Sequence, residues 1–404
     1  MSKWRKKQLQ EIAFLKPTET LKKGDIAPNI PMANIKEFQR DVVKIDYGEF
    51  RGGTKFRNGD TLLAKITPCL ENGKTAFVNC LQEDEIGFGS TEFIVLRAKE
   101  NIDERFLYYL SISPEFRKQA ISLMEGTSGR KRVNENALKI SDFLIPDFEE
   151  QRKIANILSA IDDKIQINNQ INQEFEAMAK TLYDYWFVQF DFPDQNGKPY
   201  KSSGGKMVYN PELKREIPEG WGVEKLENIA NITMGQSPKG TSYNEVGEGM
   251  LFFQGSTDFG WRFPVARQYT TEPSRIAEED DILLSVRAPV GTLNIADTRC
   301  CIGRGLAAIN SKGGANSYIF NVMQDFKKLF DMMNSVGTTF GSITKDDLYS
   351  LQLVYPPNEL LMKFDQSVKP FDREIKNRSR QNQELTQLRN WLLPMLMNGQ
   401  VKVE

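Results

Sequence analysis

The 404-residue sequence predicts an α+β protein in which two α/β modules lie in a pseudo-twofold arrangement, joined by two long antiparallel helices that form a coiled-coil spacer. Three observations predict this fold class. Short motifs recur in the same order in two halves of the chain. Each half ends in a long segment with apolar residues at heptad spacing. The chain is also longer than one ordinary domain.

The predicted boundaries follow the repeat. They are a first module at residues 1–147, a first spacer helix at 148–190, a linker at 191–217, a second module at 218–357, a second spacer helix at 358–398 and a C-terminal tail at 399–404.

The repeat is visible in four landmarks. WRKKQLQEI, from Trp4, recurs as WGVEKLENI, from Trp221. GDTLLAKITP recurs as DDILLSVRAP, and GTS at 126–128 recurs as GTT at 337–339. A short apolar stretch and a proline then follow in both halves, at Pro146 and Pro356. Several landmarks in one order make chance similarity a poor explanation.

Within each module, short apolar runs bounded by turn residues predict strands. These are TLLAKI, KTAFVN and TEFIVLR in the first module, and MLFFQG, DILLSV and LAAIN in the second. Two longer amphipathic stretches predict interposed helices, DERFLYYLSISPEFRKQAISLM and NSYIFNVMQDFKKLFDMM. The linker FDFPDQNGKPYKSSGGKMVYNPELKREIPEGW is rich in Gly, Pro and Ser and is typical of a connector.

Each predicted spacer helix has a seam of ten positions that alternate by four and three residues. In the first helix these are Ile154, Leu158, Ile161, Ile165, Asn168, Asn172, Phe175, Ala179, Leu182 and Trp186; in the second they are Phe364, Val368, Phe371, Ile375, Arg378, Asn382, Leu385, Arg389, Leu392 and Leu396. One interpretation is that each helix packs alone on its own module. We favour antiparallel pairing, which would return the second helix to the first module. We then expect the central polar residues Asn168, Asn172, Arg378 and Asn382 to fix the helix–helix register.

The sequence contains no signature of a catalytic centre. It has no histidine, which excludes Ser-His-Asp and Cys-His catalysis. No Walker-type GxxxxGK[ST] and no complete GxGxxG fingerprint is present. The four cysteines have no metal-ligand spacing and, with no signal peptide or apolar span, indicate a reduced, cytoplasmic protein. We therefore expect no catalytic residue, no metal site and no cofactor on this chain.

Binding residues are expected in loops. GTSGRKRVNEN in the first module combines glycine, two hydroxyls and three adjacent cations, a composition suited to phosphate and to guanine edges. Its candidates are Thr127, Ser128, Arg130, Lys131 and Arg132. A solvated basic loop is the structural alternative.

The counterpart GTTFGSITKDD keeps the Gly-Thr turn but has a single lysine, so charge is not the shared role of the two loops. Its candidates are Thr338, Thr339, Ser342 and Lys345. The remaining candidates lie beside predicted strands: Arg51, Lys55, Arg57 and Asn58 in the first module, and Gln236, Ser237, Lys239, Gln254, Ser256, Thr257, Arg287 and Arg304 in the second. Each of these residues is also compatible with an ordinary surface role.

The run YDYWFVQFDFPDQNGKPYKSSGGKMV followed by IPEGW resembles the segment that joins the two halves of type I restriction–modification specificity subunits. GTSGRKRV followed by FLIPDFEEQRKIANILSAIDDKI is similar to that family's transition from module to helix. The second copy, LVYPPNELLMKFDQSV, departs from it by lacking the Glu-Gln pair. The resemblance covers essentially the whole chain.

This resemblance implies a non-catalytic DNA-binding subunit. The modules would be target-recognition domains, each reading one half of a split DNA sequence, and the helices would set the gap between the half-sites. Two modification (methyltransferase) subunits would dock on the helices, and two restriction subunits would join that complex. S-adenosylmethionine, ATP and Mg²⁺ would bind those partners.

Two alternatives stay open at this point. One is a fragment of a fused restriction–modification enzyme or a stand-alone nuclease, which would cut or methylate DNA unaided. The other is a structural adaptor that binds partner subunits without conferring sequence preference.

Overall fold

The computed structural model describes residues 4–42, 44–127, 129–335 and 342–403. Thr338, Thr339 and Ser128, three of the predicted binding residues, lie outside the described residues. The chain forms two compact units, which we call unit 1 (Met1–Asn169 with Arg380–Glu404) and unit 2 (Gln170–Ser379). Unit 1 therefore contains the first module together with the C-terminal end of the chain, as antiparallel helix pairing requires.

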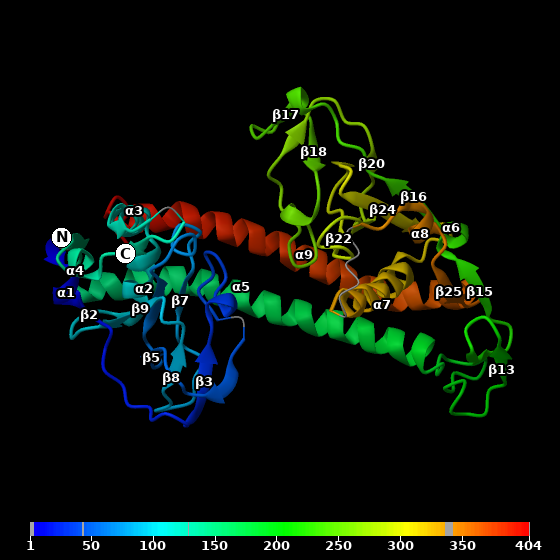
Figure 1. Cartoon of the computed structure of the whole chain (residues 1–404), viewed down its shortest axis with the longest axis horizontal. Helices are drawn as coiled ribbons and strands as arrows, with labels where there is room; N and C mark the ends of the chain where they lie inside the picture. The colour runs from blue at the N-terminus through cyan, green and yellow to red at the C-terminus, as the bar shows by residue number, and fades with distance from the viewer. Residues whose placement is uncertain (1–3, 43, 128, 336–341, 404) are drawn as a thin grey trace. The chain divides into compact units, whose positions relative to one another are not determined.

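The first module contains two four-stranded sheets (Figure 1). One sheet is antiparallel and has the order β2-β9-β6-β7, with the strands Ala13–Leu15, Phe93–Ala98, Thr61–Ala64 and Thr75–Phe77. The other has the order β4-β3-β8-β5, with the strands Asp46–Glu49, Ile26–Ile30, Gly87–Gly89 and Thr54–Phe56. Its central pair, β3 and β8, is parallel. A further pair joins β1 (Arg5–Gln8) to β12 (Asp142–Ile145).

The second module repeats this architecture. Its antiparallel sheet has the order β16-β24-β21-β22, with the strands Ala230–Met234, Leu306–Ser311, Ile282–Ser285 and Leu293–Ile295. Its other sheet has the order β17-β19-β18-β23-β20, with the strands Tyr243–Asn244, Tyr269–Thr270, Met250–Phe253, Cys300–Ile302 and Ile276–Ala277. Again the central pair, β18 and β23, is parallel. A further pair joins β15 (Gly222–Lys225) to β25 (Gln352–Tyr355).

Apart from β17, an additional edge strand of the second module, the two modules therefore share strand order and the sense of each equivalent pairing. β3 pairs antiparallel with β4 and parallel with β8, as β18 does with β19 and β23. A tertiary duplication confirms the internal repeat predicted from the sequence.

The predicted helices are present, with one difference. The stretch DERFLYYLSISPEFRKQAISLM forms two helices, α2 (Glu104–Ile112) and α3 (Pro114–Ser122). Pro114 has no N–H for the helical ladder and disfavours helical backbone before it, so the chain restarts there. Ser113 ends α2 and its side chain accepts from the Phe116 N–H as the N-cap of α3. In the second module α7 (Asn316–Ser335) is one helix.

Four shorter helices occupy matching places in the two modules. α1 (Leu9–Ile12) corresponds to α6 (Leu226–Ile229), and α4 (Glu135–Lys139) to α8 (Lys345–Tyr349).

The linker is more ordered than its composition predicts. β13 (Met207–Asn210) and β14 (Arg215–Pro218) form a two-stranded hairpin within it. Its aromatic residues pack together, since Phe192 stacks on Tyr200 at 4.6 Å and on Trp221 at 5.1 Å between ring centroids. The Gly and Ser residues therefore lie in turns of a compact element. Packing of the three aromatic rings orders this segment in spite of the local flexibility that its composition predicts.

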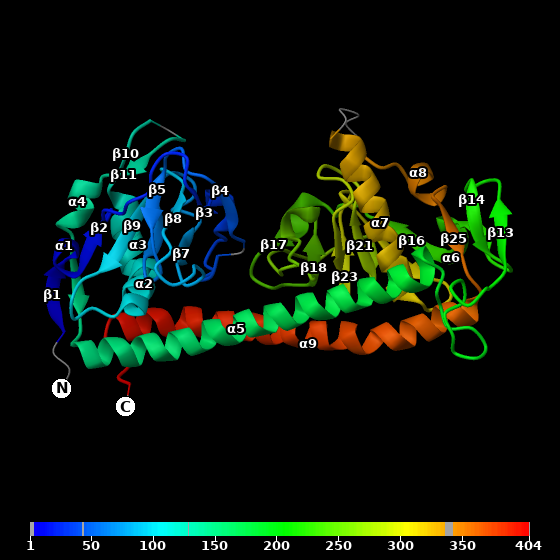
Figure 2. The ribbon, with the colours of Figure 1, turned by 90° about the horizontal axis from the view of Figure 1, so that it is seen from below.

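The two long helices are α5 (Phe148–Tyr183, followed by a π-helical turn at Asp184–Val188) and α9 (Asn358–Met397). All twenty predicted seam positions are buried or half-buried. The segments of α5 and α9 within each unit run antiparallel (Figure 2). In unit 1, Asn168 contacts Asn382 and Asp162 contacts Arg389; in unit 2, Phe175 stacks on Phe371. Pairing of the two helices is thereby confirmed.

Each module shares a hydrophobic core with the helix segments of its own unit. In unit 1, Phe106 of α2 clusters with Leu158 of α5 and Leu396 of α9. In unit 2, Tyr318 of α7 clusters with Tyr183 of α5 and Phe364 of α9. The spacer helices are thus structural parts of both modules.

Candidate nucleic-acid interface

A short backbone bridge recurs at the base of each predicted binding loop. In the first module the Val133 N–H donates to the Lys65 carbonyl at 2.9 Å. In the second the Ile343 N–H donates to the Val286 carbonyl, also at 2.9 Å. Each bridge holds the segment that follows the GTS or GTT sequence against the residue that comes directly after β6 or β21. The two modules therefore have the same backbone hydrogen bond at this place, although the side chains of their loops differ.

The basic loop of the first module connects β10 (Met124–Glu125) to β11 (Arg132–Val133). Thr127, Arg130 and Lys131 are exposed, and the Arg130 N–H donates to the Thr127 carbonyl. Arg132 differs from its neighbours because its guanidinium binds Glu92 with Nη2–Oε1 and Nε–Oε2 distances of 2.7 and 2.9 Å. This contact lowers the pKa of the Glu92 carboxyl. Arg130 and Lys131 are the cations of this loop that form no ion pair within the described residues.

The other candidates of the first module lie away from this loop or are held by the fold. Lys55, on β5, donates from Nζ to the carbonyls of Glu19 and Leu21 at 3.0 and 3.3 Å. Asn58 exchanges two hydrogen bonds with the backbone of Leu81. Arg51 forms an exposed ion pair with Glu49, and the Arg57 side chain is exposed. Lys55 and Asn58 therefore have structural contacts that sequence reasoning did not anticipate.

Five candidates of the second module line one cleft of about 440 Å³. They are Gln254, Ser256, Thr257, Arg287 and Arg304, accompanied by Gly255, Ser285, Ala288, Pro289 and Gly305. No Asp or Glu is among these ten lining residues, all of which the structure describes. Arg287 and Arg304 are exposed, and neither guanidinium forms an ion pair in the described part of the chain. Among the residues described, the cleft therefore carries two unpaired cations and no carboxylate.

Hydrogen bonds fix the wall of this cleft. The Ser237 hydroxyl and the Gln254 side-chain amide bind each other at 2.9 Å, and the Arg304 N–H donates to the same Ser237 oxygen at 3.3 Å. The Gly303 N–H donates to the Phe253 carbonyl at 2.8 Å, and the Gly305 N–H to the Gln254 carbonyl at 3.2 Å. The turn that carries Arg304 is therefore fastened to the end of β18.

The remaining candidates of the second module surround this region less closely. Gln236 is exposed, and its backbone N–H donates to the Ile302 carbonyl. Lys239 is exposed and lies 3.9 Å from Glu272. Ser342 pairs by a backbone bridge with Arg287. Lys345 begins α8 and lies over the ring of Tyr349.

The charged residues of one module align with uncharged residues of the other. Strand alignment makes Arg287 the counterpart of Ile66, Ser342 the counterpart of Arg132, and Gly305 the counterpart of Glu92. The first module thus has a cation on the loop after the GTS turn, where the second has a hydroxyl. The second module has its cations on the other two segments, and it lacks the acid that neutralises Arg132.

Two of the four predicted register residues, Asn168 and Asn382, contact each other across the helix pair in unit 1. Asn168 Nδ2 donates to Asn382 Oδ1 at 2.8 Å and to Gln381 Oε1 at 2.7 Å, and Asn382 Nδ2 donates to Asn169 Oδ1 at 2.8 Å. In unit 2, Asn172 Nδ2 donates to Ser379 Oγ at 3.4 Å. Arg378 forms an ion pair with Glu374 and lies over the Phe175 ring. Whether these contacts set the register stays a prediction.

Two buried arginines that sequence reasoning missed attach the modules to the helices. In unit 2, Arg262 binds Asp372 of α9 at 2.6 Å and Glu176 of α5 at 3.2 Å, and it stacks on the ring of Phe320. In unit 1, Arg40 binds Asp163 of α5 at 2.7 Å. Both arginines lie in the long loop that follows the first strand of the parallel pair, so alignment of the two halves was the signal that would have found them.

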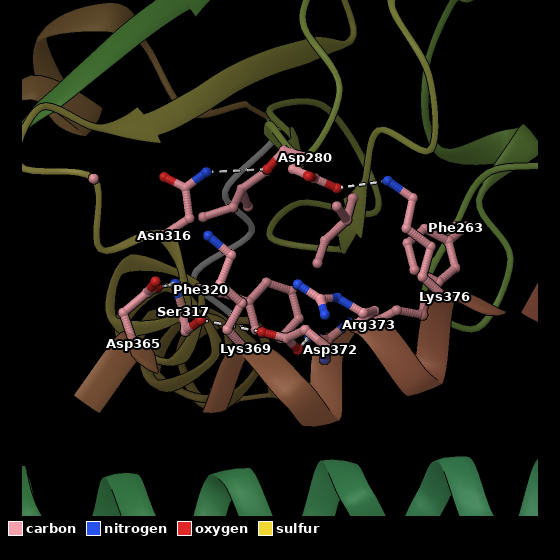
Figure 3. Close-up of a pocket in the computed structure, with 14 residues that line it drawn as sticks. Phe263, Asp280, Asn316, Ser317, Phe320, Asp365, Lys369, Asp372, Arg373 and Lys376 are labelled. Carbon is pink, nitrogen blue, oxygen red and sulfur yellow. Dashed lines mark hydrogen bonds and ion pairs between the residues drawn. The ribbon is translucent and has the colours of Figure 1, made fainter. Parts of the chain in front are cut away.

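A cavity of about 340 Å³ lies beside the Arg262 anchor (Figure 3). The Ser317 hydroxyl donates to Asp372 at 3.1 Å, and Lys376 Nζ lies 2.7 Å from Asp280 Oδ1. Burial raises the pKa of Asp372, while Arg262 and Ser317 act in the opposite direction. The residues in these contacts come from loops of the second module, from α7 and from α9. The contacts around the cavity therefore join the module to α9.

In unit 1 the corresponding position of α5 is Asp162, 210 residues before Asp372. Its carboxylate accepts from Arg389 Nη1 at 2.8 Å and from the Tyr109 hydroxyl at 2.7 Å, and both partners are buried. Each unit therefore binds the aspartate of its apolar-Asp step (Ile161-Asp162 or Phe371-Asp372) with a buried arginine.

Within the described residues, no group of three or more His, Cys, Asp or Glu side chains is placed to hold a metal ion. Nor does any helix among them have the length and apolar character needed to cross a membrane. The four cysteines are free thiols.

Comparison with known proteins identifies close relatives. The model of a family described as the type I restriction modification DNA specificity domain matches residues 1–177 and 218–387. A protein of Methanocaldococcus jannaschii, named "Putative type I restriction enzyme MjaX specificity subunit", is 31% identical over 392 residues, covering 93% of this chain and 88% of that protein. The type I restriction enzyme MjaIX specificity subunit of the same organism is 27% identical over 325 residues, covering 76% of this chain and 71% of that protein.

A solved structure shows the same fold. The S subunit of a type I restriction–modification system from M. genitalium matches 98% of this chain and 96% of its own, with a TM-score of 0.57 and 16% sequence identity.

Proposed function

Because the chain belongs to the family of type I restriction–modification DNA specificity subunits, we propose that it reads a bipartite DNA target, with each module contacting one half-site. The observation that carries this proposal is the duplication with altered side chains. Apart from the additional edge strand β17, the strand order and the loop-base bridges are the same in both modules, whereas Arg132, Glu92, Arg287 and Arg304 have no like-charged equivalent. Two different surfaces on one scaffold suit two different base sequences.

The chemistry of the exposed loops supports DNA as the ligand. Arg130 and Lys131 in the first module, and Arg287 and Arg304 in the second, are exposed cations on glycine-containing loops. Neutralising phosphates with Lys and Arg supplies most of the affinity for DNA, and hydrogen bonds to base edges supply sequence preference. The carboxylate-free cleft of the second module offers both kinds of contact.

The long helices would set the gap between half-sites and dock two modification subunits. Exposed apolar side chains on them support the docking role: Ile167 and Met178 on α5, Tyr185 on the π-helical turn that follows it, and Leu388 and Trp391 on α9. A contiguous exposed apolar patch is typical of a surface that a partner covers, and Met178 and Tyr185 line one open hollow together with Ala177 and Leu182. Two restriction subunits would join through that complex.

The same proposal places the chemistry on the partners. This chain would be non-catalytic, and S-adenosylmethionine, ATP and Mg²⁺ would bind the modification and restriction subunits. The complete system would act in the cytoplasm.

Methylation mapping of genomic DNA, in cells that carry the complete system, tests the proposal. Cells with the natural chain are compared with cells whose chain has residues 218–357 exchanged for those of another family member, and with a second exchange of residues 1–147. Each exchange should change one half-site and leave the other half-site unchanged.

Two results would contradict the proposal. Purified chain that methylates or cuts DNA without partners would be an enzyme. Exchanges that leave the methylated sequence unaltered, while partner binding is retained, would favour a structural adaptor.

A further inference from the structure

Backbone hydrogen bonds hold the turn that carries Arg304 in the second module's cleft. It links β23 to β24 through Gly303, Arg304 and Gly305. Its backbone N–H groups donate to three acceptors on two segments: the carbonyls of Phe253 and Gln254 at the end of β18, and the Ser237 hydroxyl. The Leu306 N–H closes the turn onto the Gly303 carbonyl at 2.9 Å.

The two glycines allow this close attachment. A Cβ on Gly305 would lie 2.7 Å from the Gln254 carbonyl oxygen, and a Cβ on Gly303 would lie 2.9 Å from the Gln254 Cα. Any side chain at either position would push the turn away from β18. Arg304 therefore projects from a fixed backbone position, which is what a base-reading side chain requires.

The chemistry of the cleft selects one base. A guanidinium offers two parallel N–H donors, and among the four base edges in the major groove only guanine presents two adjacent acceptors, O6 and N7. Two further side chains of the cleft can make a bidentate contact, Arg287 and Gln254. Gln254 is the type that reads adenine, and its amide is already bound to Ser237. With no carboxylate among the lining residues, the charge of Arg304 is not neutralised there.

A second arginine, Arg287, lines the same cleft from a different segment. It lies in the segment that follows β21, where the Val286 N–H donates to the Gly305 carbonyl at 2.9 Å, the Ser285 hydroxyl donates to the Arg287 carbonyl at 2.8 Å, and Arg287 forms a backbone bridge with Ser342. Contact with a phosphate requires charge and reach but little angular accuracy, because it carries no base information.

We propose that Arg304 reads a guanine in the half-site of the second module through a bidentate contact, while Arg287 binds an adjacent phosphate. The assignment rests on the proposed function. It states that this module requires a guanine, and it gives the two arginines different roles: Arg304 contacts a base and Arg287 contacts a phosphate.

The first experiment compares matched variants in the complete system. Methylated motifs are mapped for the natural chain, Arg304→Gln and Arg287→Gln. The natural motif should contain a G·C pair in the half-site that the 218–357 exchange alters. Arg304→Gln should reduce discrimination at one such pair by about 10-fold to 100-fold, the range expected for a lost bidentate contact. Arg287→Gln should leave the motif unchanged.

The second experiment removes one acceptor from the DNA. Duplexes bearing the mapped target, with each guanine of that half-site replaced in turn by 7-deazaguanine, are bound to the assembled specificity–modification complex. The natural chain should lose about fivefold or more in affinity at one guanine, and Arg304→Gln should be insensitive at that position. Arg287→Gln should keep that sensitivity while the slope of log affinity against log salt falls by about 1.

Several results would overturn the assignment. They are a second half-site without any G·C pair, an Arg304→Gln motif identical to the natural one, and a natural chain equally tolerant of 7-deazaguanine at every position.

Arg304→Lys keeps the charge and the turn. If Arg304→Gln fails to fold, Arg304→Lys should still lose single-position discrimination, because an ammonium lacks the planar fork. If the 218–357 exchange changes one half-site but the Arg304 variants do not, the assignment fails while the proposed function stands; if the exchange changes neither half-site, the proposed function itself fails.

Discussion

Buried Arg262 and half-buried Asp372 form an ion pair, with 2.6 Å between Nη2 and Oδ1, that attaches the loop of the second module to helix α9. The other nitrogen of the fork reaches Glu176 of α5, so one guanidinium contacts both helices within unit 2. Asp162, the counterpart of Asp372, is held by Arg389 in unit 1. In both halves the aspartate that follows the apolar seam residue binds a buried arginine, which comes from a module loop in unit 2 and from α9 in unit 1.

Removing Arg262 should destabilise unit 2 strongly. Arg262→Met leaves the carboxylate of Asp372 without its cation in a largely buried setting, which should lower the free energy of unfolding by about 3 kcal/mol. Denaturant titration of the purified chain measures this change. Arg299→Met is the matched control, because Arg299 and Glu278 form an exposed pair that should contribute less than about 1 kcal/mol. Equal effects of the two substitutions would contradict the anchoring role.

The asparagine contact between the helices should determine spacing more than stability. The Asn168 carbonyl oxygen is buried and accepts no hydrogen bond within the described residues. Replacing Asn168 and Asn382 together by leucine removes that cost, so the free energy of unfolding should stay the same or rise by about 1 kcal/mol. The half-site spacing accepted by the complex should broaden, because slipped registers are no longer penalised. Binding to targets with inserted or deleted central base pairs measures this, and an unchanged spacing preference would count against the register hypothesis.

Glu92 should weaken DNA binding by the first module. Its carboxylate neutralises Arg132 at the end of the basic loop. Glu92→Gln frees that guanidinium, so affinity for DNA should rise at low salt and the salt slope should steepen by about 1. Filter binding of the assembled complex at several salt concentrations provides the measurement. Glu100→Gln, an exposed change beyond the other end of β9, should leave both quantities unaltered.

The cysteines should differ sharply in reactivity. Burial raises the pKa of the Cys300 thiol to about 12, so at pH 8 almost none of it is the reactive thiolate, and the fraction rises only as pH approaches that value. Cys69 is half-buried and should be alkylated first. Mass spectrometry after timed treatment with iodoacetamide distinguishes the sites. Alkylation of Cys300 at the rate of Cys69, in folded chain, would show that β23 is not packed as the structure describes.

Much of the architecture followed from pattern alone. Heptad spacing identified both long helices and their seam, because helix periodicity is a local property of the chain. The recurrence of Trp4–Leu9–Ile12 as Trp221–Leu226–Ile229 identified the duplication, which the equivalent strand pairings confirm. The break between α2 and α3 could also have been found locally, since Pro114 is visible in the sequence.

Other features depended on contacts between distant residues. The linker hairpin exists because Phe192, Tyr200 and Trp221 pack together, which composition does not reveal. The sequence predicted Lys55 and Asn58 as binding residues, but their side chains form hydrogen bonds with the backbone of other segments, which no local pattern reveals.

The sequence by itself determined that the chain is a duplicated pair of modules, each ending in a long helix with an apolar seam, since motif order and periodicity are readable along one dimension. It also indicated that the binding loops of the two modules differ. Only the tertiary structure decided which charges remain available: Arg132 is paired with Glu92, whereas Arg287 and Arg304 share a cleft without a carboxylate. An ion pair or a shared cleft requires side chains from separate strands to meet in space, and no local pattern specifies that meeting.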